Sequence, residues 1–324
     1  MAMLKISVQR LARIKKRQGL DRWSGDYVAA IFATPKEAPS NSRPSILVPK
    51  KLGYRDMHLL SHPEKFAALL SLYHPNVWEI HEQKVLSAIP RPHFLLGHPY
   101  ATGINWPSLK GTIDVVSRMD RLAKHPKVKF LNQRNGEWEW APFPYIGDLL
   151  LFMRDEVGVY CVNWTVKDKY INFRKRGPNS KKKPSIEEFD HESELRHELE
   201  ANYYLDANIR TVQVAGEAID KDVVANLEEL FLHHGRRLVI DVKLKTEIVE
   251  CFKDVVGTQI PCFEFIFKLK DRFGVSVDVL QLVLRQSIWN RDVKVDLYQP
   301  ILMDQPLRHE TRDVLNEYSS WFVR

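Results

Sequence analysis

The segment that most restricts the fold of this chain is a pair of apolar runs separated by a tight polar turn. Residues 146–153 and 159–166 are rich in Leu, Val, Phe, Tyr and Trp, a composition that favours strands. Between them, residues 154–158 (RDEVG) are mostly polar and end in glycine, as turns commonly do. The sequence therefore predicts an antiparallel β-hairpin, with Asp148 on its first strand and Lys167 at the end of its second strand.

A short helix followed by a strand is predicted in residues 57–87. Ser61 is a good N-cap, and Glu64 follows it at the three-residue spacing of a capping box. Apolar residues then recur at helical spacing until the sequence HPN at 74–76 ends the helix, and residues 77–86 continue as a strand. Taken alone, Glu64 is typical of a helix cap, and Asp148 and Lys167 are typical of strand ends.

Further elements complete a mixed α/β pattern. A helix is predicted over residues 185–205, where Ser185 and Glu188 form a second capping box. A strand over residues 209–214 and a helix over 220–234 follow. The order from residue 61 onward is helix, strand, strand, strand, helix, strand. In the segment 88–140, which is otherwise difficult to interpret, a helix is predicted at 114–124.

The two ends of the chain differ from this middle part. Residues 1–25 are rich in Arg and Lys and have an apolar face of Val8, Leu11, Ile14 and Leu20, which predicts an amphipathic helix. A proline-rich loop follows at 35–49. Beyond residue 235, helices are predicted at 245–256, 262–273, 277–289 and 307–322. A small wing is predicted around 293–297 and Pro300, so this end suggests a winged-helix-like domain.

Composition excludes several classes of protein. Of the 324 residues, 44% are hydrophobic and 10% aromatic, so packed cores are expected. The three cysteines show no Cys-x-x-Cys spacing, which argues against a disulfide framework or a zinc site and fits a reducing compartment. No apolar run approaches the ~18 residues that a membrane span needs. The net charge of +7 and the pI of about 9.1 favour an anionic partner.

Several short motifs occur together in a characteristic order. They are PSNSR at 39–43, HLLSHPE at 58–64, IHEQ at 80–83, GHP at 97–99 and the hairpin that ends in Thr165–Val166–Lys167. In this order they resemble TnsA, the endonuclease subunit of a heteromeric bacterial transposase. The resemblance implies an α/β restriction-endonuclease-like, or PD-(D/E)xK, core followed by a C-terminal winged-helix-like domain. The implied division is a basic N-terminal helix and loop at 1–50, the endonuclease domain at 51–235 and the winged-helix-like domain at 236–324.

The resemblance also implies a catalytic site. Glu64, Asp148 and Lys167 would be catalytic, and Glu64, Asp148 and Thr165 would hold Mg²⁺, or Mn²⁺ in its place. Carboxylates are suitable ligands for Mg²⁺, and an ammonium group nearby can orient water or offset developing charge. TnsA has Gln-x-Lys where this chain has Thr165–Val166–Lys167, and a Thr hydroxyl is the weaker ligand. Asn163, at the same strand parity as Thr165, is an alternative.

The resemblance extends to partners and location. It implies cleavage at the 5′ ends of a transposon, beside a DDE-type transposase and an ATPase regulator, in the bacterial cytoplasm at the nucleoid and without a membrane. Basic side chains expected to contact double-stranded DNA are Arg43, Arg174, Lys175, Arg176, Lys181, Lys182 and Lys183. The helix that follows this run carries Glu198 and Glu200. Either side chain is a candidate to support the site, but surface positions are favoured for both.

Two alternatives remain open at this point. The first is a non-catalytic DNA- or protein-binding subunit of a transposition complex, with a decayed nuclease site, and Thr165 favours it. The second is a free-standing restriction or repair nuclease, which would cut DNA without partners.

Overall fold

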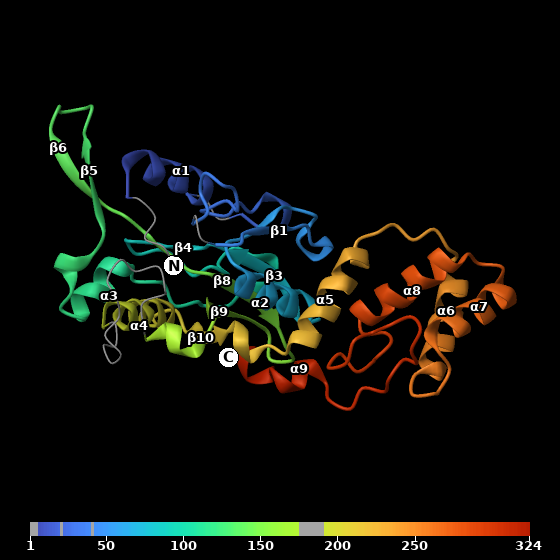
Figure 1. Ribbon diagram of the computed structural model, residues 1–324. Coiled ribbons are helices and arrows are strands. Elements are labelled where there is room, and N and C mark those ends of the chain that lie inside the picture. The colour runs from blue at the N-terminus through green and yellow to red at the C-terminus, as the bar shows by residue number, and fades with distance from the viewer. Residues whose placement is uncertain (1–5, 20–21, 40–41, 175–190) are drawn as a thin grey trace. The chain divides into compact units, whose positions relative to one another are not determined.

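A mixed four-stranded sheet carries the predicted hairpin at its centre (Figure 1). The computed structural model describes residues 6–19, 22–39, 42–174 and 191–324. The strand order is β10-β9-β8-β3, where β8 (Leu149–Arg154) pairs antiparallel with β9 (Val159–Lys167). β3 (Val77–Glu82) is antiparallel to β8, and β10 (Arg210–Ala215) is parallel to β9. The predicted hairpin is confirmed, and the predicted series is present as α2, β3, β8, β9, α4 and β10, with further elements between β3 and β8.

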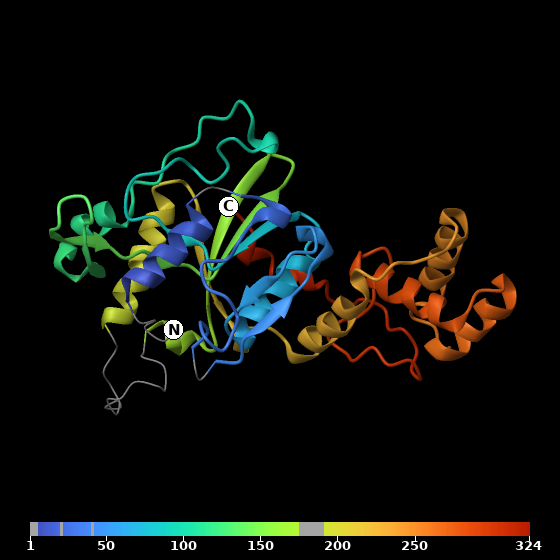
Figure 2. The same ribbon diagram turned by 90° about the horizontal axis from the view of Figure 1, so that it is seen from above.

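The central strands are buried on both faces, which is why they read as nearly continuous apolar runs. On one face, Leu150, Phe152 and Cys161 pack in a core with Leu199 and Tyr203 of α4 (His191–Leu205). Both views show α4 alongside the sheet (Figures 1 and 2). The predicted helix over 185–205 is confirmed from His191 onward, and its proposed capping box of Ser185 and Glu188 lies outside the described residues.

Two predicted strands are interrupted, and both breaks are close to the proposed site. The predicted strand 146–153 is two strands, because β7 (Tyr145–Ile146) pairs with β4 (Val85–Leu86) and only β8 joins the sheet. Asp148 therefore lies immediately before β8 and not on it, contrary to the prediction. The predicted strand 77–86 breaks between β3 and β4, where Gln83 has a left-handed backbone (φ 50°).

The remaining elements of the N-terminal half surround this sheet. α2 (His62–Tyr73) is the predicted helix, and β1 (Ser45–Leu47) pairs with β2 (Met57–Leu59). α1 (Val8–Gln18) is also confirmed, with Leu11 and Ile14 buried, although Val8 is exposed and Leu20 lies outside the described residues. Short 3₁₀ turns occupy Ser24–Asp26, Lys50–Leu52, Pro99–Ala101, Leu122–Lys124, Tyr170–Phe173 and Gly216–Ala218.

Residues 88–142 contain structure that the sequence did not reveal. The helix predicted at 114–124 is α3 (Thr112–Arg118), followed by a separate 3₁₀ turn after Asp120, whose φ of 54° ends the helix. β5 (Lys127–Leu131) and β6 (Trp138–Pro142) then form an unpredicted antiparallel ribbon.

The chain divides into two compact units. One comprises residues 1–68, 76–218 and 323–324, and the other comprises 69–75 and 219–322. The chain passes from the first unit to the second after residue 218, which is earlier than the predicted domain boundary at 235/236. That boundary remains a prediction. The second unit contains α5 (Lys221–His234), α6 (Val242–Val255), α7 (Cys262–Phe273), α8 (Val277–Trp289), α9 (Val314–Glu317) and a 3₁₀ turn at Ser319–Trp321.

Two predictions for the second unit are wrong. Residues 293–297 form no strand, and most of the predicted helix 307–322 is irregular, with helical turns only from Val314 onward. Val293, Val295 and Leu297 alternate as in a strand and are buried, but within the described residues they belong to no strand. No helix in the described parts of the chain has the length and apolar character needed to cross a bilayer.

Candidate active site

Asp148 connects the two central strands at the point where β8 begins. Its Oδ2 accepts the backbone N–H of Val166 at 2.8 Å, and its main-chain carbonyl accepts the N–H of Gln83 at 2.9 Å. The carboxylate is therefore bound to the β9 backbone between Thr165 and Lys167. This contact places Asp148 next to the end of β9 that the sequence predicted.

Glu64 lies in the first turn of α2 and is nearly fully buried. One carboxylate oxygen accepts the Leu60 N–H at 2.9 Å and the Gln83 side-chain amide at 3.0 Å, and the other accepts the Ser61 hydroxyl at 2.9 Å. The Ser61 hydroxyl in turn accepts the N–H of Glu64 at 3.4 Å. The predicted capping box is thus modified, because Glu64 bonds the backbone of Leu60 instead of that of Ser61.

Glu64 and Asp148 interact electrostatically. Burial, and then the negative charge of Asp148, raise the pKa of Glu64 to about 7 from an ordinary value of 4.5, although the hydrogen bonds from Leu60 and Ser61 and the charge of Lys167 oppose the change. A carboxyl group with this pKa is half-protonated near neutral pH. Such groups gather where the local structure is arranged to receive a cation or move a proton.

Glu200 is a third carboxylate at this place, and the sequence favoured a surface position for it. It is only 7% exposed, whereas Glu198 is exposed. Burial, and then the charge of Asp148, raise the pKa of Glu200 to about 6, and the Asn163 amide donates to its Oε1 at 3.1 Å. The helical spacing to the buried Tyr203 and Tyr204 (three and four residues) was a signal that Glu200 faces inward.

Gly147 makes room for this third carboxylate. A Cβ at position 147 would lie 3.1 Å from Oε1 of Glu200 and 3.4 Å from the hydroxyl of Tyr204. A side chain here would push Glu200 away, so the glycine before Asp148 serves the site through close approach.

Lys167 supplies the positive charge that the predicted site requires. It is partly exposed, its Nζ lies 3.3 Å from the carbonyl oxygen of Val166, and it is close enough to affect the titration of both Glu64 and Glu200. His197 on α4 is also near: burial first, then the charge of Lys167, lower its pKa to about 3, so it is neutral at physiological pH.

Several buried polar atoms at the site have no hydrogen-bond partner in the described part of the chain. They are Oγ1 of Thr165, Oε1 of Gln83 and Oδ1 of Asn163. An unsatisfied buried oxygen costs about 1–3 kcal/mol, so such atoms are uncommon unless water or an ion binds them. All three are oxygen atoms on or beside the strands that hold Asp148, and oxygen is the donor type that Mg²⁺ prefers.

The side chains at this place include oxygen donors of the type that Mg²⁺ uses. Mg²⁺ is usually held by one or two carboxylates together with water and substrate phosphate oxygens. Glu64 and Asp148 provide the carboxylates, and Thr165, which is 2% exposed, provides a hydroxyl without another partner in the described residues. Within residues 6–19, 22–39, 42–174 and 191–324, no group of three His, Cys, Asp or Glu side chains is arranged to hold a metal ion.

The structure describes only part of the predicted DNA-contacting set. Arg43 and Arg174 are exposed, as the prediction requires. The other five predicted residues lie outside the described ranges: Lys175, Arg176, Lys181, Lys182 and Lys183.

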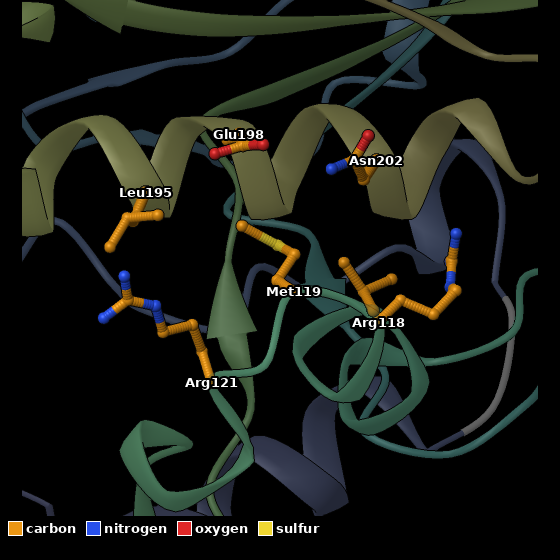
Figure 3. Close-up of a pocket in the computed structure, with 7 residues that line it drawn as sticks. Arg118, Met119, Arg121, Leu195, Glu198 and Asn202 are labelled. Carbon is orange, nitrogen blue, oxygen red and sulfur yellow. The ribbon is translucent and has the colours of Figure 1, made fainter.

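A cavity of about 410 Å³ is a different feature from this site (Figure 3). It lies between α4 and the segment that contains α3, and it is lined by Val115, Arg118, Met119, Arg121, Leu195, Glu198 and Asn202. Glu198, one of the two candidates to support the site, lines this cavity, but Glu64, Asp148, Thr165 and Lys167 do not. We therefore place the candidate active site on the carboxylates and not in this cavity.

The unpartnered hydroxyl of Thr165 leads to a prediction. Thr165→Val is expected to leave the metal-free protein as stable as the wild type, or more stable by about 1 kcal/mol, because it removes a buried group without a partner. Thr211→Val is the matched control, since Oγ1 of Thr211 accepts a hydrogen bond from Asn163 and its loss should destabilise. Urea unfolding in EDTA measures both, and a Thr165→Val variant destabilised more than the control would show that the hydroxyl is bonded in solution.

Neither protein-family models nor curated proteins match this chain.

Proposed function

We propose that this protein is a metal-dependent DNA endonuclease of the TnsA type, which cuts at the 5′ ends of a transposon during cut-and-paste transposition. The observation that supports the proposal most is the convergence of Glu64, Asp148 and Lys167 at one end of the β8–β9 hairpin. These residues are far apart in the sequence, yet their charges influence one another. Their order along the chain is the one expected of a restriction-endonuclease-like site, with Glu64 on α2, Lys167 at the end of β9 and Asp148 immediately before β8.

The arrangement of strands agrees with the proposed fold. The hairpin β8–β9 has the parallel strand β10 on one side and β3 on the other, and α2 precedes the sheet strands while α4 connects β9 to β10. For the second unit, the helices α6, α7 and α8 are compatible with a winged-helix-like domain, but the wing strands that the sequence predicted are not formed there. We therefore assign protein contact, rather than base reading by a wing, to this unit.

Each residue has a defined task in the proposed reaction. Glu64 and Asp148 would hold Mg²⁺ or Mn²⁺, and Thr165 would add a hydroxyl oxygen. A divalent cation at this place supplies positive charge against the phosphate and makes an attacking water more acidic. Lys167 orients that water or stabilises negative charge that develops on the scissile phosphate. Arg43 and Arg174, together with the basic residues that follow, would hold the DNA backbone.

Gln83, which is fully buried, holds parts of this site in place. Gln83 connects the carboxylate of Glu64 to the main chain of Asp148, since its side chain donates to Glu64 and its backbone N–H donates to the main-chain carbonyl of Asp148. The left-handed backbone of Gln83 makes this double contact possible, because it turns the chain out of β3 at that residue. Gln83 is therefore a positioning residue for both proposed metal ligands.

A cleavage assay tests the proposed function. The substrate is supercoiled DNA carrying candidate transposon ends, with Mg²⁺ or Mn²⁺, and the protein is tested alone and with its partner transposase and ATPase. Cleavage at the 5′ ends that appears only with the partners supports the proposal. Cleavage by the protein alone would identify a free-standing nuclease instead, and no cleavage in an assembled complex would refute the enzymatic proposal.

A second candidate function is a non-catalytic subunit with a decayed nuclease site. The observation in its favour is Thr165 at the position where related nucleases carry an acid or amide. Calorimetric titration with Mg²⁺ separates the two: binding that disappears in Asp148→Asn supports the nuclease, and absence of binding to both proteins in the presence of DNA supports the non-catalytic subunit.

A further inference from the structure

The ribbon of β5 and β6 projects from the rest of its unit (Figure 1), and one of its faces has an unusual composition. In its register, Leu131 is opposite Trp138, Lys129 is opposite Trp140, and Lys127 is opposite Pro142. Side chains of directly opposed residues point to the same side of a sheet, and alternate residues of each strand share that side. The lysines of β5 and the tryptophans of β6 therefore lie side by side on one surface, which we call the Lys–Trp face.

The opposite side of the ribbon is attached to the protein. Val128 is buried and belongs to a hydrophobic core with Leu11 and Ile14 of α1, and Ala141 packs against that core. The ribbon is thus anchored through one side at its base. The Lys–Trp face is the side left to solvent.

The two indole rings on this face are mostly exposed. Trp138 is 62% exposed and Trp140 is 58% exposed, and Leu131 beside them is also exposed. An exposed tryptophan loses a large hydrophobic stabilisation, and clusters of such side chains commonly mark binding sites. Within the described residues, β5 and β6 pair only with each other, so the Lys–Trp face does not belong to a larger sheet.

Charge indicates what this face binds. The Nζ of Lys127 lies 5.1 Å from the ring centroid of Trp140, and that of Lys129 lies 5.5 Å from the ring of Trp138. Neither lysine has a carboxylate partner within the described ranges. Their positive charges are therefore available to an anionic partner, and each lies beside an aromatic surface.

The spacing of the indoles favours unpaired bases. Trp138 and Trp140 are two residues apart on one strand, so they are about 6.8 Å apart along it. This is about twice the 3.4 Å between successive nucleotides of a duplex strand, so the ring spacing does not match neighbouring bases that remain paired and stacked on each other. An extended single strand can instead offer a base to each ring and a phosphate to each lysine.

An anionic membrane is the competing partner, and the position of the lysines disfavours it. The ammonium groups lie 5.1 and 5.5 Å from the ring centroids, so inserting the indoles into a bilayer would carry two charges with them at a high free-energy cost. We propose that the Lys–Trp face binds unpaired nucleobases of single-stranded DNA by stacking on Trp138 and Trp140. This goes beyond the proposed function, since it concerns binding and requires no cleavage.

Fluorescence anisotropy tests the proposal with full-length protein in EDTA, so that cleavage plays no part. The probe is a labelled oligo(dT) strand, compared with a duplex of the same length. Trp138→Ala/Trp140→Ala is expected to bind the single strand at least about 25-fold more weakly, about fivefold for each stacked base, with a smaller change for the duplex. Trp138→Tyr/Trp140→Tyr is the matched control, because it keeps two aromatic rings and should bind within a few-fold of wild type.

Two further measurements keep the test decisive if the alanine variant folds poorly. With the wild-type protein, an abasic oligonucleotide of equal length and charge should bind more weakly than oligo(dT). With Lys127→Gln/Lys129→Gln, the dependence of log affinity on log salt should become shallower by about 1.4. Equal binding of abasic and normal strands would overturn the proposal, as would unchanged DNA affinity of the alanine variant together with lost binding to phosphatidylserine vesicles.

Discussion

Asp148→Asn is expected to reduce DNA cleavage at least about 1,000-fold while complex assembly remains intact. The change removes a negative charge from a proposed metal ligand, which costs several kcal/mol of transition-state stabilisation at about 1.4 kcal/mol per tenfold in rate. The asparagine carbonyl can still accept the N–H of Val166, a bond of 2.8 Å in the wild type, so the start of β8 should be preserved. Cleavage at fixed Mg²⁺, measured with and without partner proteins, gives the rate.

Asp168→Asn is the matched control for that experiment. Asp168 follows Lys167 in the chain, carries the same charge and is exposed to solvent. Its loss should change the rate by only a few-fold if the effect at Asp148 is specific to the buried site. An Asp148→Asn variant that cuts as fast as the Asp168→Asn variant would show that the site has been placed wrongly.

Glu64 is expected to make the free energy of unfolding depend on pH between about 4.5 and 7. Its pKa rises from 4.5 to about 7 on folding, so in this range the folded state holds more protons than the unfolded state. The free energy of unfolding therefore falls as pH increases through this window. The loss is on the order of a few kcal/mol and arises from Glu64 together with Asp148, whose charge contributes to the raised pKa.

Comparison of wild type with Glu64→Gln isolates this contribution. Denaturant unfolding in EDTA at pH 5 and pH 8 should show the additional loss in the wild type and not in the variant. The comparison cancels other titrating groups, including Glu200, which acts in the same direction, and His197, whose lowered pKa acts in the opposite direction. Equal pH dependence in both proteins would mean that Glu64 titrates at its ordinary pKa.

Magnesium supplies a second arm of the same experiment. A cation bound to ionised Glu64 should offset the cost of burying its charge, so Mg²⁺ should stabilise the wild type more at pH 8 than at pH 5. The stabilisation should be lost in Glu64→Gln. Stabilisation by Mg²⁺ that is equal in both proteins would place the ion elsewhere.

Local sequence was sufficient for most of the elements near the site. The two apolar runs around the polar turn at 154–158 predicted the β8–β9 hairpin, and the cap at Ser61 and the break after Tyr73 predicted α2. These signals depend on residues that are neighbours in the chain, which is why they can be read without tertiary structure. Glu64, Asp148 and Lys167 were assigned because a family resemblance joined them, and not because any one of them was distinctive.

Local patterns misled where burial came from distant segments. The alternation at 293–297 predicted a strand, but its apolar side chains are buried without the segment forming a strand. The apolar residues of 307–322 predicted a helix, although only a short part of that segment is helical. In both cases an apolar residue reveals that it will be buried, but not the conformation in which burial occurs.

By itself the sequence determined the mixed α/β character, the central hairpin and the order of the elements, because caps, turns and periodicity act over a few residues. Only the tertiary structure decided that Glu200 joins Glu64 and Asp148, that Gln83 connects the two, and that Thr165 has no hydrogen-bond partner in the described residues. It also exposed the Lys–Trp face of an unpredicted ribbon. The physical reason is that burial, charge coupling and hydrogen-bond satisfaction depend on distances between segments, and those distances exist only after the chain has folded.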